Sequence, residues 1–213
     1  MTTSIRRPYT GSCHCGSTRY ILHLNLPHTR IRIPTKEENP DNRPPTDVQL
    51  FYRCNCTVCQ KAGILHILTV SPPDDFLLLA PLDPEAELGD YRARDGGVHW
   101  YFCKTCGMRC FAFIGPSEVV DVDVGAAGES LRDVLSKKAG AGAGPIKAWR
   151  PKKEGWQGYL SINAGSLDAG QEGLDLREWK EKDWVMYLDL LEARGPGTME
   201  LPRYGIPHED GMY

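Results

Sequence analysis

Three cysteines stand within six residues of one another, in the stretch Cys54-Asn-Cys-Thr-Val-Cys59. The C-x-C-x-x-C spacing lets three thiols converge on one small soft ion with little rearrangement of the backbone. Zinc is the expected ion; it takes four ligands in structural sites, whereas catalytic sites combine three protein ligands with water or substrate. Because this stretch supplies three thiols, it predicts a zinc site with one open position.

Four of the remaining cysteines form a second set. Cys13 and Cys15 flank a histidine near the N-terminus, and Cys103 and Cys106 form a C-x-x-C in the middle of the chain. Together they predict a closed, structural four-thiolate zinc site. Cys110 is left over, and we expect it to be a small buried apolar residue in the strand that follows the C-x-x-C turn.

Two alternative interpretations of the cysteines remain open at this point. The triple-cysteine site would be structural if Cys110, His14 or His66 completed its coordination shell. We expect His14, flanked by ligands, to point outward, and His66, in an apolar stretch, to be a hydrogen-bonded core histidine. A dithiol redox role for the C-x-x-C is less favoured, because no thioredoxin-like βαβ pattern surrounds it.

Length, composition and charge limit the function further. The 213 residues, 41% of them hydrophobic, suit a single domain with a substantial core. A net charge of −3, from 25 basic and 28 acidic residues, gives no strong field toward nucleic acid or an anionic membrane. The basic cluster at residues 147–153 is small, and we expect it to be a solvated surface.

No signal-peptide-like segment opens the sequence, and the longest aliphatic run, residues 76–80, is too short to span a bilayer. We therefore expect no membrane partner and a cytoplasmic location. In a reducing compartment, closely spaced cysteines favour metal binding over structural disulfides.

Short alternating or apolar stretches, separated by glycine and proline, predict a mainly β fold with few short helices. Residues 1–8 are expected to be a lead-in, frayed to about residue 10, residues 9–194 the zinc domain, and residues 195–213 a tail. Two insertions are expected, a proline-rich exposed loop at about 27–47 and a segment at about 125–158 that contains the flexible Ala139–Gly144 tract. The expected strands cover residues 19–26, 48–53, 64–70, 76–80, 88–94, 98–102, 110–114, 119–124 and 159–163; residues 174–179 are expected to form one or two helical turns, and 184–188 a strand or short helix.

Four stretches resemble the glutathione-dependent formaldehyde-activating enzyme family, which includes centromere protein V. They are Gly11-Ser-Cys-His-Cys-Gly-Ser-Thr-Arg-Tyr20, Cys54-Asn-Cys-Thr-Val-Cys-Gln-Lys-Ala-Gly63, Tyr101-Phe-Cys-Lys-Thr-Cys-Gly107 and Ser161-Ile-Asn-Ala-Gly-Ser-Leu-Asp168, in the family's order. The similarity spans residues 9–190, and the two insertions and the tail depart from it.

The resemblance implies a mainly antiparallel, tent-like β fold with two zinc ions. Carried over by position, Cys13, Cys15, Cys103 and Cys106 would hold the structural zinc, and Cys54, Cys56 and Cys59 the catalytic one. The implied activity is that of a carbon–sulfur lyase, or carrier, that forms and cleaves S-(hydroxymethyl)glutathione or a related thiol–aldehyde adduct. The alternative is a non-catalytic zinc module that binds a protein or, less expectedly, nucleic acid.

The chemistry of a three-thiolate site is consistent with thiol activation. An open position could accept a substrate thiol, whose usual pKa of about 8.5 leaves it mostly protonated in water, and coordination would remove its proton. The resulting thiolate is the nucleophile. Three thiolates make the complex a poor Lewis acid, which favours thiol activation over carbonyl polarisation. Glutathione carries two carboxylates, and Arg53 and Lys61, which flank the cysteines, are the expected cations that bind it.

Overall fold

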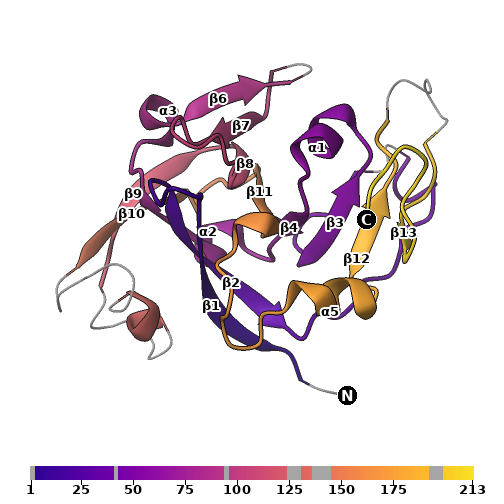
Figure 1. Cartoon of the computed structure of the whole chain (residues 1–213), viewed down its shortest axis with the longest axis horizontal. Coiled ribbons are helices and arrows are strands. Elements are labelled where there is room, and N and C mark those ends of the chain that lie inside the picture. The colour runs from indigo at the N-terminus through magenta and orange to yellow at the C-terminus, as the bar shows by residue number, and fades with distance from the viewer. Residues whose placement is uncertain (1–2, 41–42, 94–95, 124–130, 136–144, 192–198) are drawn as a thin grey trace.

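The computed structural model describes residues 3–40, 43–93, 96–123, 131–135, 145–191 and 199–213, and most of the elements in them are strands (Figure 1). The strands are β1 (Ile5–Ser12), β2 (Arg19–Leu26), β3 (Leu50–Cys54), β4 (His66–Leu68), β5 (Phe76–Ala80), β6 (Gly89–Arg92), β7 (His99–Phe102), β8 (Phe111–Ile114), β9 (Ser117–Val122), β10 (Ile146–Pro151), β11 (Tyr159–Asn163), β12 (Val185–Leu188) and β13 (Arg203–Tyr204). The short helices are α1 (Thr57–Ala62), α2 (Pro72–Asp75), α3 (Pro84–Glu87), η1 (Ala164–Ser166) and α5 (Leu176–Glu181). The expected mainly β fold with few short helices is confirmed.

Two sheets organise these strands. The five-stranded sheet has the order β1-β2-β5-β10-β9, and the eight-stranded sheet has the order β13-β12-β3-β4-β11-β8-β7-β6. Pairing between the described strands is antiparallel, as expected, except that β3 and β12 run parallel, with Leu188 opposite Cys54. This parallel pair places the end of β12 beside the triple-cysteine turn.

The largest hydrophobic core draws side chains from both sheets. Leu22 and Phe76 of the five-stranded sheet belong to the same buried cluster as Phe111 and Leu160 of the eight-stranded sheet. Strand β2 was expected to be half-buried, yet Ile21 is also buried, in a separate cluster with Leu77 and Leu135. Side chains on both faces of β2 therefore contact apolar groups.

The first residues of the chain are more ordered than the sequence suggested. Strand β1 pairs with β2 over its whole length, from Ile5 opposite Leu26 to Ser12 opposite Arg19. Pro8 lies within β1, and an edge strand tolerates proline because one row of its backbone groups has no partner strand. The expectation of a frayed lead-in to residue 10 was therefore wrong from Ile5 onward.

The segment expected as an insertion at 125–158 contains a strand of the five-stranded sheet. Strand β10 pairs with β9 and, at Trp149, with β5. Trp149 and Ala148 are buried, and the basic side chains of this segment form ion pairs, including Lys147 with Asp121 at 3.1 Å and Arg150 with Glu118 at 2.9 Å. The Ala139–Gly144 tract, expected to be flexible, lies outside the described residues.

The proline-rich loop and the tail also contact the body of the protein. Among its described residues, the 27–47 stretch contains no strand or helix, in keeping with the expected loop. Ile31 and Ile33 nevertheless pack on the cluster that contains the triple cysteines. Strand β13 of the tail pairs with β12. The domain limits drawn from the sequence remain predictions.

His28, in the proline-rich loop, is buried against strand β3 of the eight-stranded sheet. Its ring lies 4.5 Å from that of Phe51, and its Nδ1 is 3.3 Å from Nε2 of Gln49. Its Nε2 is buried and has no hydrogen-bond partner among the described residues. Burial lowers the pKa of His28 to about 4, so the folded protein holds this ring neutral.

This burial predicts acid sensitivity that a single substitution should reduce. Between pH 6.5, the ordinary histidine pKa, and about pH 4, the unfolded chain binds a proton at His28 that the folded chain does not. The free energy of unfolding should therefore fall as the pH falls through this window, by about 1.4 kcal/mol per pH unit from this residue. His28→Phe keeps the ring contact with Phe51, and Gln49 still donates to the Asn25 carbonyl at 2.8 Å.

Chemical denaturation at pH 7 and pH 5 measures the effect. Between pH 7 and pH 5, the free energy of unfolding of the native protein should fall by about 2 kcal/mol more than that of His28→Phe. Protonation of the cysteines affects both proteins, so the difference isolates the histidine. Equal losses would contradict a neutral buried His28.

Candidate functional site

The first thiol cluster joins two turns that are far apart in the sequence. Cys13 and Cys15 follow β1, and Cys103 and Cys106 follow β7; their four Sγ atoms all lie within 4.8 Å of one another. The Sγ atoms of Cys15 and Cys103 are 3.5 Å apart, as are those of Cys13 and Cys15. Gly16 and Gly107, with φ of 78° and 74°, adopt the left-handed conformation in these turns that glycine tolerates.

These distances suit a tetrahedral zinc ion. With zinc–sulfur bonds of about 2.3 Å, sulfurs at the corners of a tetrahedron are about 3.8 Å apart. Cys13 and Cys103 are buried, whereas Cys15 is exposed and Cys106 partly buried. Hydrogen bonding to Ser17 lowers the pKa of Cys15 to about 6, which favours the thiolate that metal binding requires. The expected grouping of these four cysteines is confirmed.

The second cluster comes from one short stretch of chain. Cys54 ends β3, Cys56 is the N-cap residue of α1, and Cys59 lies in α1. Their Sγ atoms also lie within 4.8 Å of one another, and those of Cys54 and Cys56 are 3.3 Å apart. All three thiols are buried. The helix ends at Gly63, whose φ of 64° is left-handed.

The surroundings of Cys54 and Cys59 disfavour their free anions. Hydrogen bonding to Cys56, together with burial, raises the pKa of Cys54 to about 12. The pKa of Cys59 is raised as well, by hydrogen bonds with the other two thiols and by burial. Three buried thiolates need a compensating positive charge, and a divalent soft cation supplies it. The donor set therefore fits zinc, with Cys54, Cys56 and Cys59 as the residues that would hold it.

His66, at the start of β4, borders this cluster. Its Nε2 lies 3.0 Å from Sγ of Cys59, and its Nδ1 lies 2.6 Å from Oγ of Ser161 on β11. The ring is 1% exposed and stacks on Tyr52 at 4.4 Å, and burial lowers its pKa to about 3. The expectation of a hydrogen-bonded core histidine is confirmed, but the contact with Cys59 places His66 in the site.

Two tyrosine hydroxyls lie near these groups. The hydroxyl of Tyr159, two residues before Ser161 on β11, lies 2.8 Å from that of Tyr52. Tyr52 precedes Cys54 by two residues on β3. The paired hydroxyls of Tyr52 and Tyr159 and the hydrogen-bonded pair of Ser161 and His66 thus border the triple-cysteine cluster.

The cations expected near the cysteines differ in their surroundings. Arg53 is partly buried and donates from Nη1 to the Ile64 carbonyl at 3.5 Å, and burial lowers its pKa. Lys61 is exposed and lines a pocket of about 360 Å³ whose other walls are Ala62, Gly107, Met108, Arg109 and Asn163. Arg109, which the sequence analysis did not single out, lies over the ring of Tyr91 at 5.5 Å.

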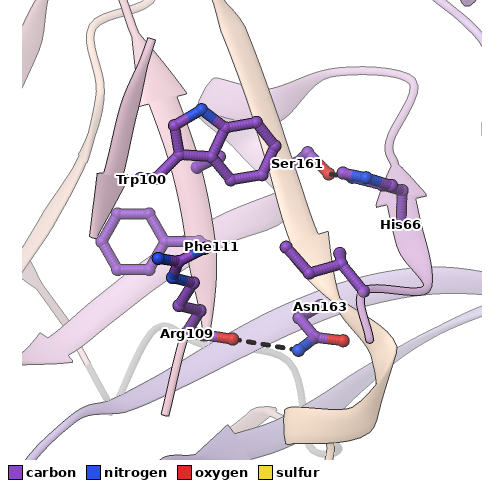
Figure 2. Close-up of a pocket in the computed structure, with 8 residues that line it drawn as sticks. His66, Trp100, Arg109, Phe111, Ser161 and Asn163 are labelled. Atoms are coloured by element: carbon purple, nitrogen blue, oxygen red, sulfur yellow. Dashed lines mark hydrogen bonds between the residues drawn. The ribbon is translucent and has the colours of Figure 1, made fainter. Parts of the chain in front are cut away.

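Neither Lys61 nor Arg109 has an acidic partner among the described residues, so this pocket carries two uncompensated positive charges. Arg109 and Asn163 also line a neighbouring cavity, drawn in Figure 2 with His66, Trp100, Phe111 and Ser161 around it. Figure 2 also marks the hydrogen bond of 3.0 Å from Nδ2 of Asn163 to the Arg109 carbonyl. The cavity volume is about 10 Å³, enough for about one water molecule. Arg109 and Asn163 line both spaces, whereas Lys61 lines the larger one and His66 the smaller one.

Other candidates from the sequence lie outside the two clusters. Cys110 is 2% exposed in the main core, as expected of a buried apolar residue, and His14 is exposed. The ion pairs of Lys147 and Arg150 described above partly neutralise the basic cluster at 147–153, consistent with a solvated surface. Within the described part of the chain, no helix has the length and apolar composition needed to cross a bilayer.

Fold and site together define a mainly β protein with two cysteine clusters that could hold metal ions. Comparison of the chain with models of known protein families and with curated proteins gives no match. Among solved structures it matches the crystal structure of a Rhodobacter sphaeroides protein, with 13% sequence identity, a TM-score of 0.35, and coverage of 76% of this chain and 91% of the other. A similarity of this size indicates no function, which must be inferred from the cysteine clusters themselves.

The two clusters should respond differently to loss of one ligand. Cys103→Ser removes a ligand from the cluster that joins two distant turns, and should lower the melting temperature by about 10 °C or more, since each kcal/mol is worth about 2–4 °C at this size. Cys56→Ser removes a ligand from the cluster whose members are neighbours in sequence. It should leave a folded protein with a smaller fall in melting temperature.

Thermal unfolding and the zinc content of the purified proteins measure both effects. The native protein should contain two zinc ions per chain, and Cys56→Ser one. An equal loss of stability in the two variants would contradict the division into a structural cluster and a locally formed one.

Proposed function

We propose that this protein is a zinc-dependent carbon–sulfur lyase or carrier of the glutathione-dependent formaldehyde-activating type, which forms and cleaves the adduct of a small thiol and an aldehyde. The observation that carries the proposal is the difference between the two clusters. One offers four sulfurs, and the other offers three buried sulfurs next to a buried histidine. Four protein ligands suit a structural zinc, and three suit a catalytic one.

Zinc bound by Cys54, Cys56 and Cys59 would stabilise a substrate thiolate at neutral pH. The reaction itself needs no redox partner. The thiol sulfur forms a bond to the aldehyde carbon, the carbonyl π bond breaks, and the thiol proton ends on the former carbonyl oxygen. Cleavage reverses these steps and returns the thiol and the aldehyde.

The hydrogen bonds of His66 orient the sulfur of Cys59. A cysteine thiolate has no proton, so it can only accept, and Nε2 of His66 must then donate to Cys59. In a neutral ring Nδ1 then accepts, here from the Ser161 hydroxyl. Both donors, the Ser161 hydroxyl and Nε2 of His66, then point toward Cys59, which supports a role for His66 in holding its sulfur in place.

The positive pocket favours a thiol that carries carboxylates. Lys61 follows Cys59 by two residues in α1, and Arg109 reaches the same pocket from the turn that follows the first cluster. Carboxylates bind well to such pairs of cations. Arg53, the other expected cation, donates from Nη1 to the Ile64 carbonyl at 3.5 Å, and its role in substrate binding stays a prediction. We therefore assign substrate binding to Lys61 and Arg109, with glutathione as the first thiol to test.

Exchange spectroscopy by NMR tests the proposed activity. The rate of interconversion between free glutathione plus formaldehyde and S-(hydroxymethyl)glutathione should rise when the zinc-loaded protein is added. Cys56→Ser should abolish the increase while leaving a folded protein. An unchanged exchange rate with the fully zinc-loaded protein would refute the lyase activity toward this adduct and favour a non-catalytic zinc module.

Charge removal in the pocket tests the assignment of the substrate. Lys61→Gln and Arg109→Gln should each raise KM for glutathione by about fivefold, since an exposed ion pair is worth up to about 1 kcal/mol. KM for an uncharged thiol such as 2-mercaptoethanol should change little.

Lys147→Gln is a suitable control, because Lys147 is an exposed cation on the five-stranded sheet, paired with Asp121. It should leave both KM values as in the native protein. If the pocket variants raised KM equally for the charged and the uncharged thiol, the two cations would not be recognising carboxylates.

A further inference from the structure

The residue in the middle of the C-x-C motif is buried and well hydrogen-bonded. Asn55 is 1% exposed; its Nδ2 donates to Oδ1 of Asp189 at 2.7 Å and to the Glu209 carbonyl at 3.0 Å. Its Oδ1 accepts from the backbone N–H of Leu190 at 2.8 Å. Both amide hydrogens and the amide oxygen are therefore engaged, which fixes the orientation of the side chain between two cysteine ligands.

The partners of Asn55 come from two distant segments. Asp189 and Leu190 directly follow β12, the strand that runs parallel to β3. Asp189 is fully buried, and its Oδ2 accepts from the backbone N–H of Glu200, at the start of the C-terminal segment, at 2.9 Å. Its carboxylate therefore connects the cysteine turn to residues 199–213, hereafter the C-terminal segment.

The C-terminal segment is fastened to the eight-stranded sheet before it reaches the cysteines. Strand β13 pairs with β12, and Nε2 of His208, which is 4% exposed, lies 3.1 Å from the Tyr187 carbonyl. Tyr204 packs on the cluster that contains the three cysteines, and its hydroxyl accepts from the N–H of Ile31 at 3.2 Å. The segment thus also holds the proline-rich loop against the site.

Beyond His208, the segment touches the cysteine stretch at two points. The Glu209 carbonyl accepts from Asn55, and the Asp210 carbonyl accepts from Nε2 of Gln60, which follows Cys59 in α1, at 2.5 Å. Figure 1 shows the C-terminus beside β12 and β13. A side chain on Gly211 would place its Cβ 3.5 Å from Cβ of Asn55 and 2.9 Å from the His208 carbonyl oxygen. The end of the chain therefore packs closely on the turn.

We propose that Asn55 and the C-terminal segment form a latch that holds the triple-cysteine turn in its metal-binding geometry and so slows the loss of the metal. Asn55 acts as a positioning residue, since it fixes the backbone between Cys54 and Cys56 rather than contributing a ligand. Hydrogen-bonding partners of this kind orient metal ligands and raise metal affinity. The proposal depends on the metal site of the proposed function, but not on the lyase reaction.

Zinc release from two full-length variants tests the latch from both sides of the contact. In Asn55→Ala, zinc should leave the triple-cysteine site about 10–100-fold faster than in the native protein, the usual size of such effects. Gly211→Val should also speed release, because its Cβ would lie only 2.9 Å from the His208 carbonyl oxygen, so the end of the segment that contacts Asn55 must shift. Excess chelator that changes absorbance on binding zinc gives the rates, and NMR signals of the backbone amides in the two cysteine turns show which site empties.

Ile206→Ala is the matched control. It changes the same segment at a side chain that is 63% exposed, so its release rate should equal that of the native protein. Since Asn55→Ala and Gly211→Val break one contact, the double variant should release zinc no faster than the faster single variant.

Three results would overturn the latch: native-like release from Gly211→Val, effects that multiply in the double variant, or equal acceleration at both zinc sites, which would indicate general destabilisation. These measurements do not depend on catalysis. If the NMR exchange experiment shows no lyase activity but the release rates follow the expected pattern, the proposed reaction fails and the latch stands.

Discussion

The approach of Cys15 to Cys103 is the contact on which the arrangement of the two sheets depends. The two sulfurs are 3.5 Å apart and 88 residues apart in sequence. Cys15 follows β1 at the edge of the five-stranded sheet, and Cys103 follows β7 in the eight-stranded sheet. A metal ion bound by both turns would close a long loop of chain. Closing such a loop costs the chain much conformational entropy, which metal binding would offset. The core that draws side chains from both sheets is consistent with this restriction.

The geometry of the triple-cysteine cluster is determined in a different way. Its ligands are neighbours in sequence, so the metal closes no long loop there. Its geometry depends instead on buried polar groups contributed by other strands: His66 with Ser161 on one side, and Asp189 with Asn55 on the other. Buried polar groups must be hydrogen-bonded, and such networks admit few arrangements. Hydrogen bonds from distant strands therefore hold the side chains of this short motif in one arrangement.

Two of the three segments that depart from the family resemblance, the proline-rich loop and the tail, meet at this same cluster. Ile31 and Ile33 of the proline-rich loop and Tyr204 of the C-terminal segment pack on the group that contains the three cysteines. The positive pocket of Lys61 and Arg109 lies between the stretches that follow the two cysteine clusters. The proline-rich loop and the C-terminal segment are therefore placed where they contact the triple-cysteine cluster.

The sequence alone determined the features that depend on neighbouring residues. An alternating pattern located β2 and an apolar run located β5, both at their observed limits, and ligand spacing divided seven cysteines into groups of four and three. Only the tertiary structure placed β1 against β2, β10 within the five-stranded sheet, and β12 parallel to β3. It also decided that His66 contacts Cys59, that Arg109 joins Lys61, and that Asn55 meets Glu209. Each of these depends on segments far apart in the chain, whose approach is set by packing and hydrogen bonding rather than by local pattern.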